Sequence, residues 1–378
     1  MKRIFASLLC LFVAASCSDN DKPGIRPETI TLNKTTLLLG IGKSETLTAT
    51  VTPENATDKR VEWSSDNTAA VTVDDGVVTA VADGVAVITA KTTGGGLAAT
   101  CSVTATSAVA VSTMEEFQTA LDQAAGTAAA PAKILMTADI PVYLNIRGDE
   151  NTRKYIGIDG GGHTLSYLNV YTNEIIMNIY YRASVKLTNM KIDGIAEKEW
   201  SNPIFYLNFG ADPDADNHLV LGNGVEITNA NASAVVNIGA GCSATMERGA
   251  AIRNCRSRAI VKHSSGLFIY NGGALQNAPT TIYFTYRDDF IPMQLAAAPE
   301  DDWTLNVQSG KPGDFDGNKF PATPVVLMQG KDYTLTAQDL DKLSLVDIYF
   351  SESRDVADYE LTLDTGANAI LIRMKADK

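Results

Sequence analysis

The sequence predicts an all-β protein in two successive parts, a small β-sandwich followed by a parallel β-solenoid. Between Ile30 and Thr106 the chain is rich in Val, Thr and Ala in alternating patterns, with turn residues about every 8–12 positions. The fragments NGVEITN, RGAAIRN and NGGALQN, which begin at Asn223, Arg248 and Asn271, restate one short pattern. A single amphipathic segment with helical spacing lies between these two regions.

Residues 1–16 have the features of a signal peptide. Lys2 and Arg3 precede an apolar stretch that is shorter than the ~20 residues a bilayer span needs. The small residues Ala14-Ala15-Ser16 then lead to Cys17. We expect cleavage before Cys17, with residues 17–28 as a linker to the folded chain.

A cysteine at this place resembles the lipobox of bacterial lipoproteins, with Ala14 where Leu is usual. The resemblance implies lipidation of Cys17. The following segment SDNDK is similar to the short acidic signal that directs lipoproteins of Bacteroidetes-type bacteria to the outer surface. It implies an outer membrane lipoprotein exposed at the cell surface and held by a lipid anchor. The alternative is a secreted protein in which Cys17 lies near the cleavage point by chance.

Net charge and cysteine content restrict the partners. Cleavage removes two basic residues and changes the net charge from −13 to −15, which disfavours nucleic acid as a partner because phosphate binding needs a basic face. Beyond the leader and Cys17, the cysteines Cys101, Cys242 and Cys255 lack metal-type spacing. A Cys242–Cys255 disulfide and buried free thiols are both open readings.

The sandwich is expected over residues 29–107. Its segment from Val61 to Thr92 contains Trp-Ser-Ser, an Ala-Val-Thr-Val strand and two Asp-Gly turns. We expect Trp63 in the core, and positive φ at the hairpin turns Asp75-Gly76 and Asp83-Gly84. The segment resembles the bacterial Ig-like group 2 domain over about 80 residues. That resemblance implies a spacer or adhesive module on a cell-surface protein.

Residues 112–125 are expected to form a capping helix at the start of the solenoid. Apolar residues recur at helical spacing, and a capping box is available at the first turn. The residues are Met114, Phe117 and Leu121 for the apolar face, Ser112 or Thr113 for the cap, and Glu115 or Glu116 for its partner. Such a helix covers the apolar interior and the unpaired backbone that the first coil of a solenoid exposes.

The repeated pattern defines the register of the coils. Aligning Gly224, Gly249 and Gly272 gives intervals of 25 and 23 residues and brings Asn229, Asn254 and Asn277 into one column. The same alignment stacks Leu221 on Met246 and Ile269, and Ile227 on Ile252 and Leu275. Degenerate copies occupy Ile156–Leu165 and Val185–Gly194, so the repeat extends over several coils.

Each repeat is a β coil, because the units are short alternating runs cut by Gly and Asn. Glycine allows the bend between strands, and asparagine either tolerates the left-handed conformation or stacks its amide on the neighbouring coils. Residues from about 112 to 310, with IDGGGHTL at Ile158–Leu165, resemble the right-handed parallel β-helix of the pectate-lyase-like superfamily. The expected fold is therefore an Ig-like β-sandwich followed over 108–378 by a right-handed parallel β-helix with an N-terminal capping helix. The strands after Phe320 are expected to cap its far end.

The resemblance raises an enzymatic alternative, a polysaccharide lyase or a glycoside hydrolase acting on acidic glycans. Such enzymes need carboxylates or bases at matching positions of adjacent coils. In the predicted register Asp159 matches the Gly222 position and Asp193 matches Thr228. Glu226 faces Ala251 and Ala274, and Glu247 faces Gly222 and Tyr270. We therefore assign no catalytic residue.

The strongest ligand-binding candidates are basic. The segment RNCRSRAIVKH gathers Arg253, Arg256, Arg258 and Lys262, with Arg248 and His263 beside them, in a strongly acidic chain. A cationic edge near Tyr270 suits an acidic glycan. The alternative is a solvated turn whose charges pair with Asp288 and Asp289.

No metal site and no other cofactor is predicted, although two acidic loops keep calcium open as an alternative. Residues 212–216 and 314–318 carry carboxylates at alternate positions. Neither loop has the Glu that closes a calcium loop, since Asn223 and Val325 occupy the twelfth positions.

The sequence thus predicts a surface lipoprotein whose non-catalytic β-helix binds a polysaccharide or a cell-surface protein, in the manner of an adhesin. Its membrane contact is the lipid anchor. The identity of the ligand and the oligomeric state have no signal in the sequence. A purely structural surface component is a third reading.

Overall fold

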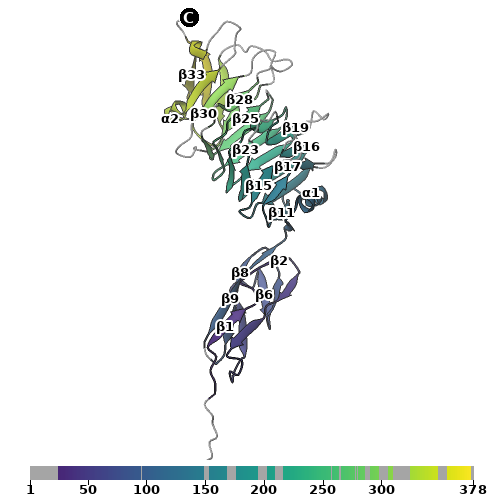
Figure 1. The fold of residues 1–378 in the computed structure, drawn as a ribbon. Coiled ribbons are helices and arrows are strands. Elements are labelled where there is room, and N and C mark those ends of the chain that lie inside the picture. Colours follow the sequence, from purple (N-terminus) through teal and green to yellow (C-terminus); the bar gives the residue numbers. More distant parts are fainter. Residues whose placement is uncertain are drawn as a thin grey trace, which may run out of the picture. The chain divides into compact units, whose positions relative to one another are not determined.

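The computed structural model describes residues 24–94, 96–148, 153–167, 176–194, 202–208, 216–256, 258–263, 265–276, 278, 280–285, 290–297, 305–309, 324–347 and 356–375. The chain divides into two compact units, Met1–Ser107 and Ala108–Lys378. Both are built mainly of β-strands, which confirms the predicted all-β class (Figure 1). No helix among the described residues is long and apolar enough for a bilayer span. The predicted signal peptide and Cys17 lie outside these residues.

The first unit is a β-sandwich with its own apolar core. One sheet has the order β2-β9-β8-β5, another has the order β3-β7-β6, and β1 pairs with β4. The strands are β1 (Thr29–Leu32), β2 (Thr36–Gly40), β3 (Ser44–Thr46), β4 (Ala49–Thr52), β5 (Val61–Ser65), β6 (Val71–Asp74), β7 (Val77–Ala80), β8 (Gly84–Thr92) and β9 (Ala98–Thr106). The core includes Val71, Val78, Ile88 and Val103, each fully buried.

Two expectations for this unit need correction. Trp63 is only partly buried, because it packs at the margin of two clusters of core residues. Asp75 and Gly76 form the predicted hairpin turn between β6 and β7, with φ of 45° and 80°. Gly84 has the expected positive φ, at 158°, but Asp83 and Gly84 do not form a second hairpin turn, because β7 and β8 belong to different sheets and the chain crosses between them there.

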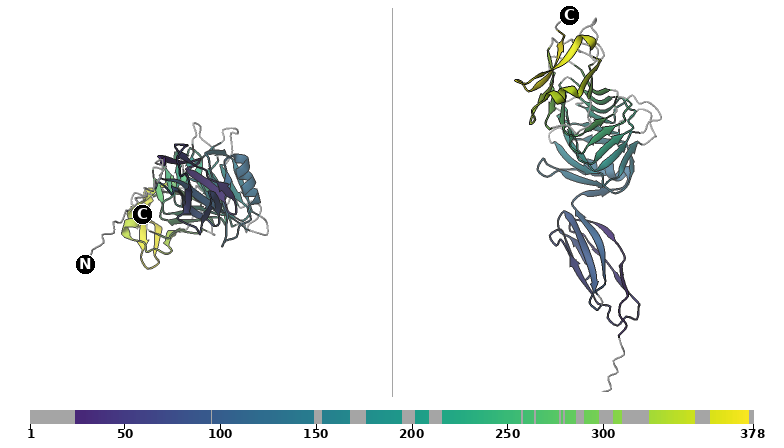
Figure 2. Two further views of the ribbon diagram at one scale, coloured as in Figure 1. Left: turned by 90° about the horizontal axis from the view of Figure 1, so that it is seen from below. Right: turned by 90° about the vertical axis from the view of Figure 1, so that its left-hand side faces the viewer.

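The second unit winds through three parallel sheets within the described residues, one strand of each sheet per coil in the regular part (Figure 2). The first sheet contains β10 (Val109–Val111), β11 (Ala132–Met136), β14 (Lys154–Asp159), β17 (Ala183–Thr188), β20 (His218–Leu221), β23 (Ser243–Glu247), β26 (Leu267–Asn271) and β29 (Met293–Leu295). The second contains β12 (Ile140–Val142), β15 (Thr164–Tyr167), β18 (Met190–Asp193), β21 (Val225–Thr228), β24 (Ala251–Arg253) and β27 (Ala274–Gln276). The third contains β13 (Leu144–Arg147), β16 (Met177–Tyr180), β19 (Phe205–Asn208), β22 (Ala234–Ile238), β25 (Arg258–Lys262), β28 (Thr280–Phe284), β30 (Leu305–Ser309) and β32 (Leu343–Asp347).

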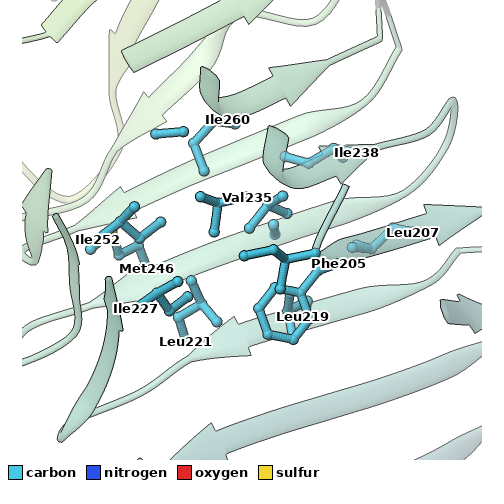
Figure 3. Packing of buried hydrophobic residues seen from close by; sticks show 14 of the residues in the cluster. Phe205, Leu207, Leu219, Leu221, Ile227, Val235, Ile238, Met246, Ile252 and Ile260 are labelled. Atoms are coloured by element: carbon cyan, nitrogen blue, oxygen red, sulfur yellow. The ribbon is translucent and has the colours of Figure 1, made fainter. Parts of the chain in front are cut away.

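This order of strands is the one a parallel β-helix requires. Aliphatic side chains of successive coils stack inward, as the close view of the core shows (Figure 3). In the second sheet the buried column is Ile140, Leu165, Ile192, Ile227, Ile252 and Leu275, which confirms the predicted stacking of Ile227 on Ile252 and Leu275. Each coil supplies one layer of a continuous interior that no single coil can bury alone.

The predicted register is wrong at one coil of the first sheet. Leu221 pairs with Met246 as expected, but Met246 pairs with Tyr270 rather than Ile269. The turn after β26 is one residue shorter than the turn after β23, so alignment on the glycines shifts the strand by one residue. A shift of one residue exchanges the two faces of a strand, and Tyr270 is therefore the buried residue.

The turn residues adopt the predicted conformations. Gly224, Gly249 and Gly272 have φ between 77° and 81°. Asn229 and Asn254 have φ of 59° and 55°, in the left-handed region that asparagine tolerates. Asn277 lies outside the described residues.

Helix α1 (Met114–Gln123) covers the start of the coil. The capping box is formed by Thr113 and Glu116, and Phe117 and Leu121 are buried, whereas Met114 is exposed. Gln118 exchanges two hydrogen bonds with the backbone of Asn145, at 2.9 and 3.1 Å. The helix thus satisfies backbone groups of β13, the first strand of the third sheet, as a cap must.

The far end is closed by the C-terminal strands. β31 (Val325–Gly330) pairs in parallel with β29 and antiparallel with β34 (Ala369–Met374), which forms a hairpin with β33 (Tyr359–Asp364). Two short helical segments, α2 (Ala337–Asp341) and η1 (Val356–Asp358), lie in the same region of the chain. The antiparallel strands end the run of parallel pairing in the first sheet, as the predicted cap requires.

Candidate functional site

The three predicted arginines lie at the turn that joins the second sheet to the third. Arg253 ends β24, Arg256 lies in the turn, and Arg258 begins β25. The left-handed Asn254 directs the chain around this corner, and its amide donates to the carbonyl of Gln276 in the next coil. Arg256 is exposed. We call Arg253, Arg256 and Arg258 the basic corner.

Neighbouring coils hold two of these side chains. Arg253 donates from Nη1 to Oε1 of Gln276 at 2.9 Å. The Arg258 guanidinium carbon lies 4.1 Å from the ring centroid of Tyr283, a cation–π geometry. Tyr283 itself packs with Ala234 and Val261 on the outer side of the third sheet. The basic corner is therefore partly preorganised, and neither Gln276 nor Tyr283 carries a negative charge that would neutralise it.

Lys262 does not belong to this surface. Its side chain is fully buried, in the inward column between Ile238 and Phe284. The ammonium lies 4.2 Å from the ring centroid of Phe290 and donates to the carbonyl of His263. Because side chains alternate along a strand, Lys262 shares the inward face of Ile260. Arg248 lies at another edge of the coil, in the exposed turn after β23.

A second group of chemically active side chains was not predicted. It lies where the third sheet passes to the first. Tyr181 and Arg182 form this corner with φ of 55° and 59°, although neither is glycine. The Arg147 guanidinium carbon is 4.7 Å from the ring centroid of Tyr181, which is 5.3 Å from that of Tyr180. Consecutive left-handed residues of this size cost conformational energy and mark the corner as unusual.

The same corner continues over the next coils with polar contacts. Arg153 pairs with Asp216 at 2.6 Å, and His218 Nδ1 lies 2.7 Å from Ser243 Oγ. Burial lowers the pKa of His218, so its imidazole favours the neutral form. These residues come from three coils and are far apart in sequence. The only local signal is the run Tyr180-Tyr181-Arg182 at a strand end.

Of the four acidic residues that were compared between coils, three follow the predicted register and Glu247 does not. Asp159 pairs with Thr188, Asp193 pairs with Thr228, and Glu226 lies between Lys191 and Ala251. Glu247 pairs with Asn271 rather than Tyr270, because of the register shift described above. Lys186 reaches Glu247 at 2.8 Å from two coils away. Gly222 leaves the space for that contact, because a Cβ there would lie 3.1 Å from Lys186 Cε.

The cysteines are free thiols. Cys101, Cys242 and Cys255 are buried and none of them forms a disulfide, which decides between the two alternatives left open by the sequence. Burial raises the pKa of Cys255 to about 12, and it raises the pKa of Cys242 as well. Such thiols are poor nucleophiles at neutral pH.

The two acidic loops lie outside the described residues, apart from Asp216, which pairs with Arg153. Within the described part of the chain, no three His, Cys, Asp or Glu side chains gather in a way that could hold a metal ion. Asp288 and Asp289, the predicted partners of the basic corner, also fall outside that part.

Comparison with known proteins identifies the first unit. Residues 28–103 match the bacterial Ig-like domain (group 2), which confirms the resemblance seen in the sequence. An uncharacterized protein of Clostridium acetobutylicum is 44% identical over 79 residues. The match covers 20% of this chain and 8% of that protein. An Ig-like domain of this group indicates a surface or adhesion-type role.

Proposed function

We propose that the chain is a cell-surface lipoprotein whose second unit is a non-catalytic binding module for acidic polysaccharides. Cys17 carries the lipid anchor in the outer membrane, and the Ig-like domain lies between this anchor and the coil in the sequence. The basic corner is the recognition site. The role is that of an adhesin or a glycan-capturing protein.

The observation that carries this proposal is the placing of the basic corner in a chain of net charge −13. Three arginines flank one turn, Arg256 is exposed, and Arg258 rests on an aromatic ring. A guanidinium can bind a carboxylate through two parallel hydrogen bonds, and the planar fork suits uronate or other carboxylated sugars. Stacking on Tyr283 restricts Arg258 before binding, which lowers the entropy cost of ligand capture.

The test is binding of residues 27–378 to an array of neutral and acidic polysaccharides, compared with an Arg253/Arg256/Arg258→Ala variant. We expect binding to acidic glycans that weakens with added salt and is lost in the variant. The matched control is Lys59/Lys91/Arg248→Ala, which removes the same charge at exposed positions elsewhere and should bind normally. An equal loss of glycan binding in both variants would show that binding depends on net charge and not on the basic corner. Absence of binding by the unaltered protein would favour a protein partner or a structural role.

A further inference from the structure

One column of side chains on the outer face of the third sheet leads away from the basic corner. In successive coils it contains Asn145, Asn178, Tyr206, Asn237, Val261 and Tyr283, all in register. None of these six side chains is charged. Tyr283, the sixth of these residues, supports the guanidinium of Arg258. The register continues beyond it to Gln308 and Asp347. At about 4.8 Å per coil, Asn178 lies ~19 Å along the axis from Tyr283.

The amide groups of this column are incompletely paired. Asn178 Nδ2 approaches Asn145 Oδ1 at 3.5 Å, the start of an amide ladder. Tyr206 interrupts that ladder in the next coil. The Oδ1 atoms of Asn178 and Asn237, on either side of Tyr206, are buried and accept no hydrogen bond. Buried acceptors are nearly always paired, so both atoms point to a donor that the described residues do not supply.

The side chain between them is suited to a sugar ring. Tyr206 is only partly buried. Burial raises its pKa, and its hydroxyl therefore remains a hydrogen-bond donor at neutral pH. A sugar residue presents hydroxyl donors at its rim and an apolar face to an aromatic ring, which matches two carbonyl acceptors beside a tyrosine.

We infer that Asn178, Tyr206 and Asn237 form a binding subsite for neutral sugar residues. The inference rests on the proposed function in one respect, because the acidic residue of the same glycan lies at the basic corner. The ligand is then a heteropolysaccharide with neutral residues along the column and a carboxylated residue at Arg258.

The test uses residues 27–378 and isothermal titration with three probes: neutral mannan and glucan oligosaccharides, oligogalacturonate, and an oligosaccharide that contains neutral and uronate residues. Asn178→Leu and Asn237→Leu replace each amide by an apolar group of similar size. We expect each variant to bind the neutral and mixed probes about tenfold more weakly, as for one lost hydrogen bond at a buried site. Binding of oligogalacturonate should be unchanged.

The melting temperature of the free protein separates a ligand site from a structural role. Removal of the unpaired acceptor in Asn237→Leu should leave the melting temperature unchanged or raise it, whereas removal of a structural hydrogen bond lowers it. Asn178→Leu also loses the 3.5 Å contact with Asn145, so a small decrease is expected there. Thr245→Leu, which adds an apolar side chain to the outer face of the first sheet, is the control and should bind all probes normally. If a leucine variant no longer unfolds cooperatively, Tyr206→Ala is used in its place, because loss of the aromatic ring should weaken binding of the neutral and mixed probes as well.

Normal binding of the neutral and mixed probes by the leucine variants would overturn the inference and assign the two acceptors to ordered water. Binding of oligogalacturonate with no binding of neutral sugar would also overturn it, while the proposed function stands. Oligogalacturonate binding that survives Arg253/Arg256/Arg258→Ala, together with loss of neutral binding in the leucine variants, would keep the subsite and refute the role of the basic corner.

Discussion

Lys262 shows that the position of a residue in the coil decides whether its side chain is buried or exposed. It is adjacent in sequence to other basic residues, yet it occupies an inward position beneath the ring of Phe290. Arg253 and Arg258, which flank a turn, remain at the surface region with fixed partners. Charge clustering in the sequence therefore locates the corner but does not separate its surface members from an interior one.

His218 gives a prediction at this scale. Burial lowers its pKa in the folded chain, whereas the unfolded imidazole titrates near about 6.5. The unfolded state therefore binds more protons as the pH falls through this value, and the free energy of unfolding decreases. We expect the melting temperature to drop between about pH 7.5 and 5.5, with a smaller drop in His218→Asn.

Ser243→Ala is the matched control for this experiment. It removes the hydroxyl beside Nδ1 but keeps the buried imidazole, so most of the pH dependence should remain. An identical dependence in the His218→Asn variant and the unaltered protein would exclude this histidine as its source.

At the scale of elements, turns and caps fix where each strand begins. The Gly249 turn joins β23 to β24 with φ of 79°, and a Cβ there would overlap the side-chain oxygen of Asn223 in the preceding coil. At the start of the coil, the capping box fixes the first turn of α1, and two hydrogen bonds between the Gln118 side chain and the Asn145 backbone hold the helix against β13. We therefore expect substitutions that change the backbone geometry at these points to destabilise the fold more than substitutions of side chains on the outer faces.

Gly249→Val tests this restriction. The substitution places a β-branched residue in the left-handed region and against Asn223, so it should lower stability by about 2 kcal/mol or more. Arg256→Ala, at an exposed turn position, should change it by less than about 0.5 kcal/mol. Thermal unfolding of both variants measures the difference, and equal small shifts would contradict the turn assignment.

For the whole molecule, each unit has a separate apolar core. The sandwich core around Val71, Ile88 and Val103 shares no residue with the core of the coil. The division of the chain falls between Ser107 and Ala108. Each unit is therefore expected to fold and unfold independently of the other.

Calorimetry checks this expectation. The fragments 24–107 and 108–378 should each unfold cooperatively, and the full chain should show two transitions at the temperatures of the fragments. A single transition of the full chain at a temperature above both would reveal strong coupling between the units.

The sequence by itself determined the all-β class, the Ig-like domain, the capping helix and the repeating coil. Local rules sufficed for these features: alternation for strands, glycine and asparagine for turns, and a capping box for the helix. The same rules located the basic corner, because its residues are neighbours in the chain. They were wrong where one missing turn residue moved Tyr270 into the core in place of Ile269.

Only the tertiary structure decided which side chains meet between coils. Arg147 and Tyr181, Arg153 and Asp216, and His218 and Ser243 are each separated by 25 residues or more. The column of Asn178, Tyr206 and Asn237 depends on turns of different length being stacked in register. The physical reason is that contacts between coils follow from the parallel hydrogen-bond ladder, whereas a sequence pattern reports mainly the conformation of each coil taken alone.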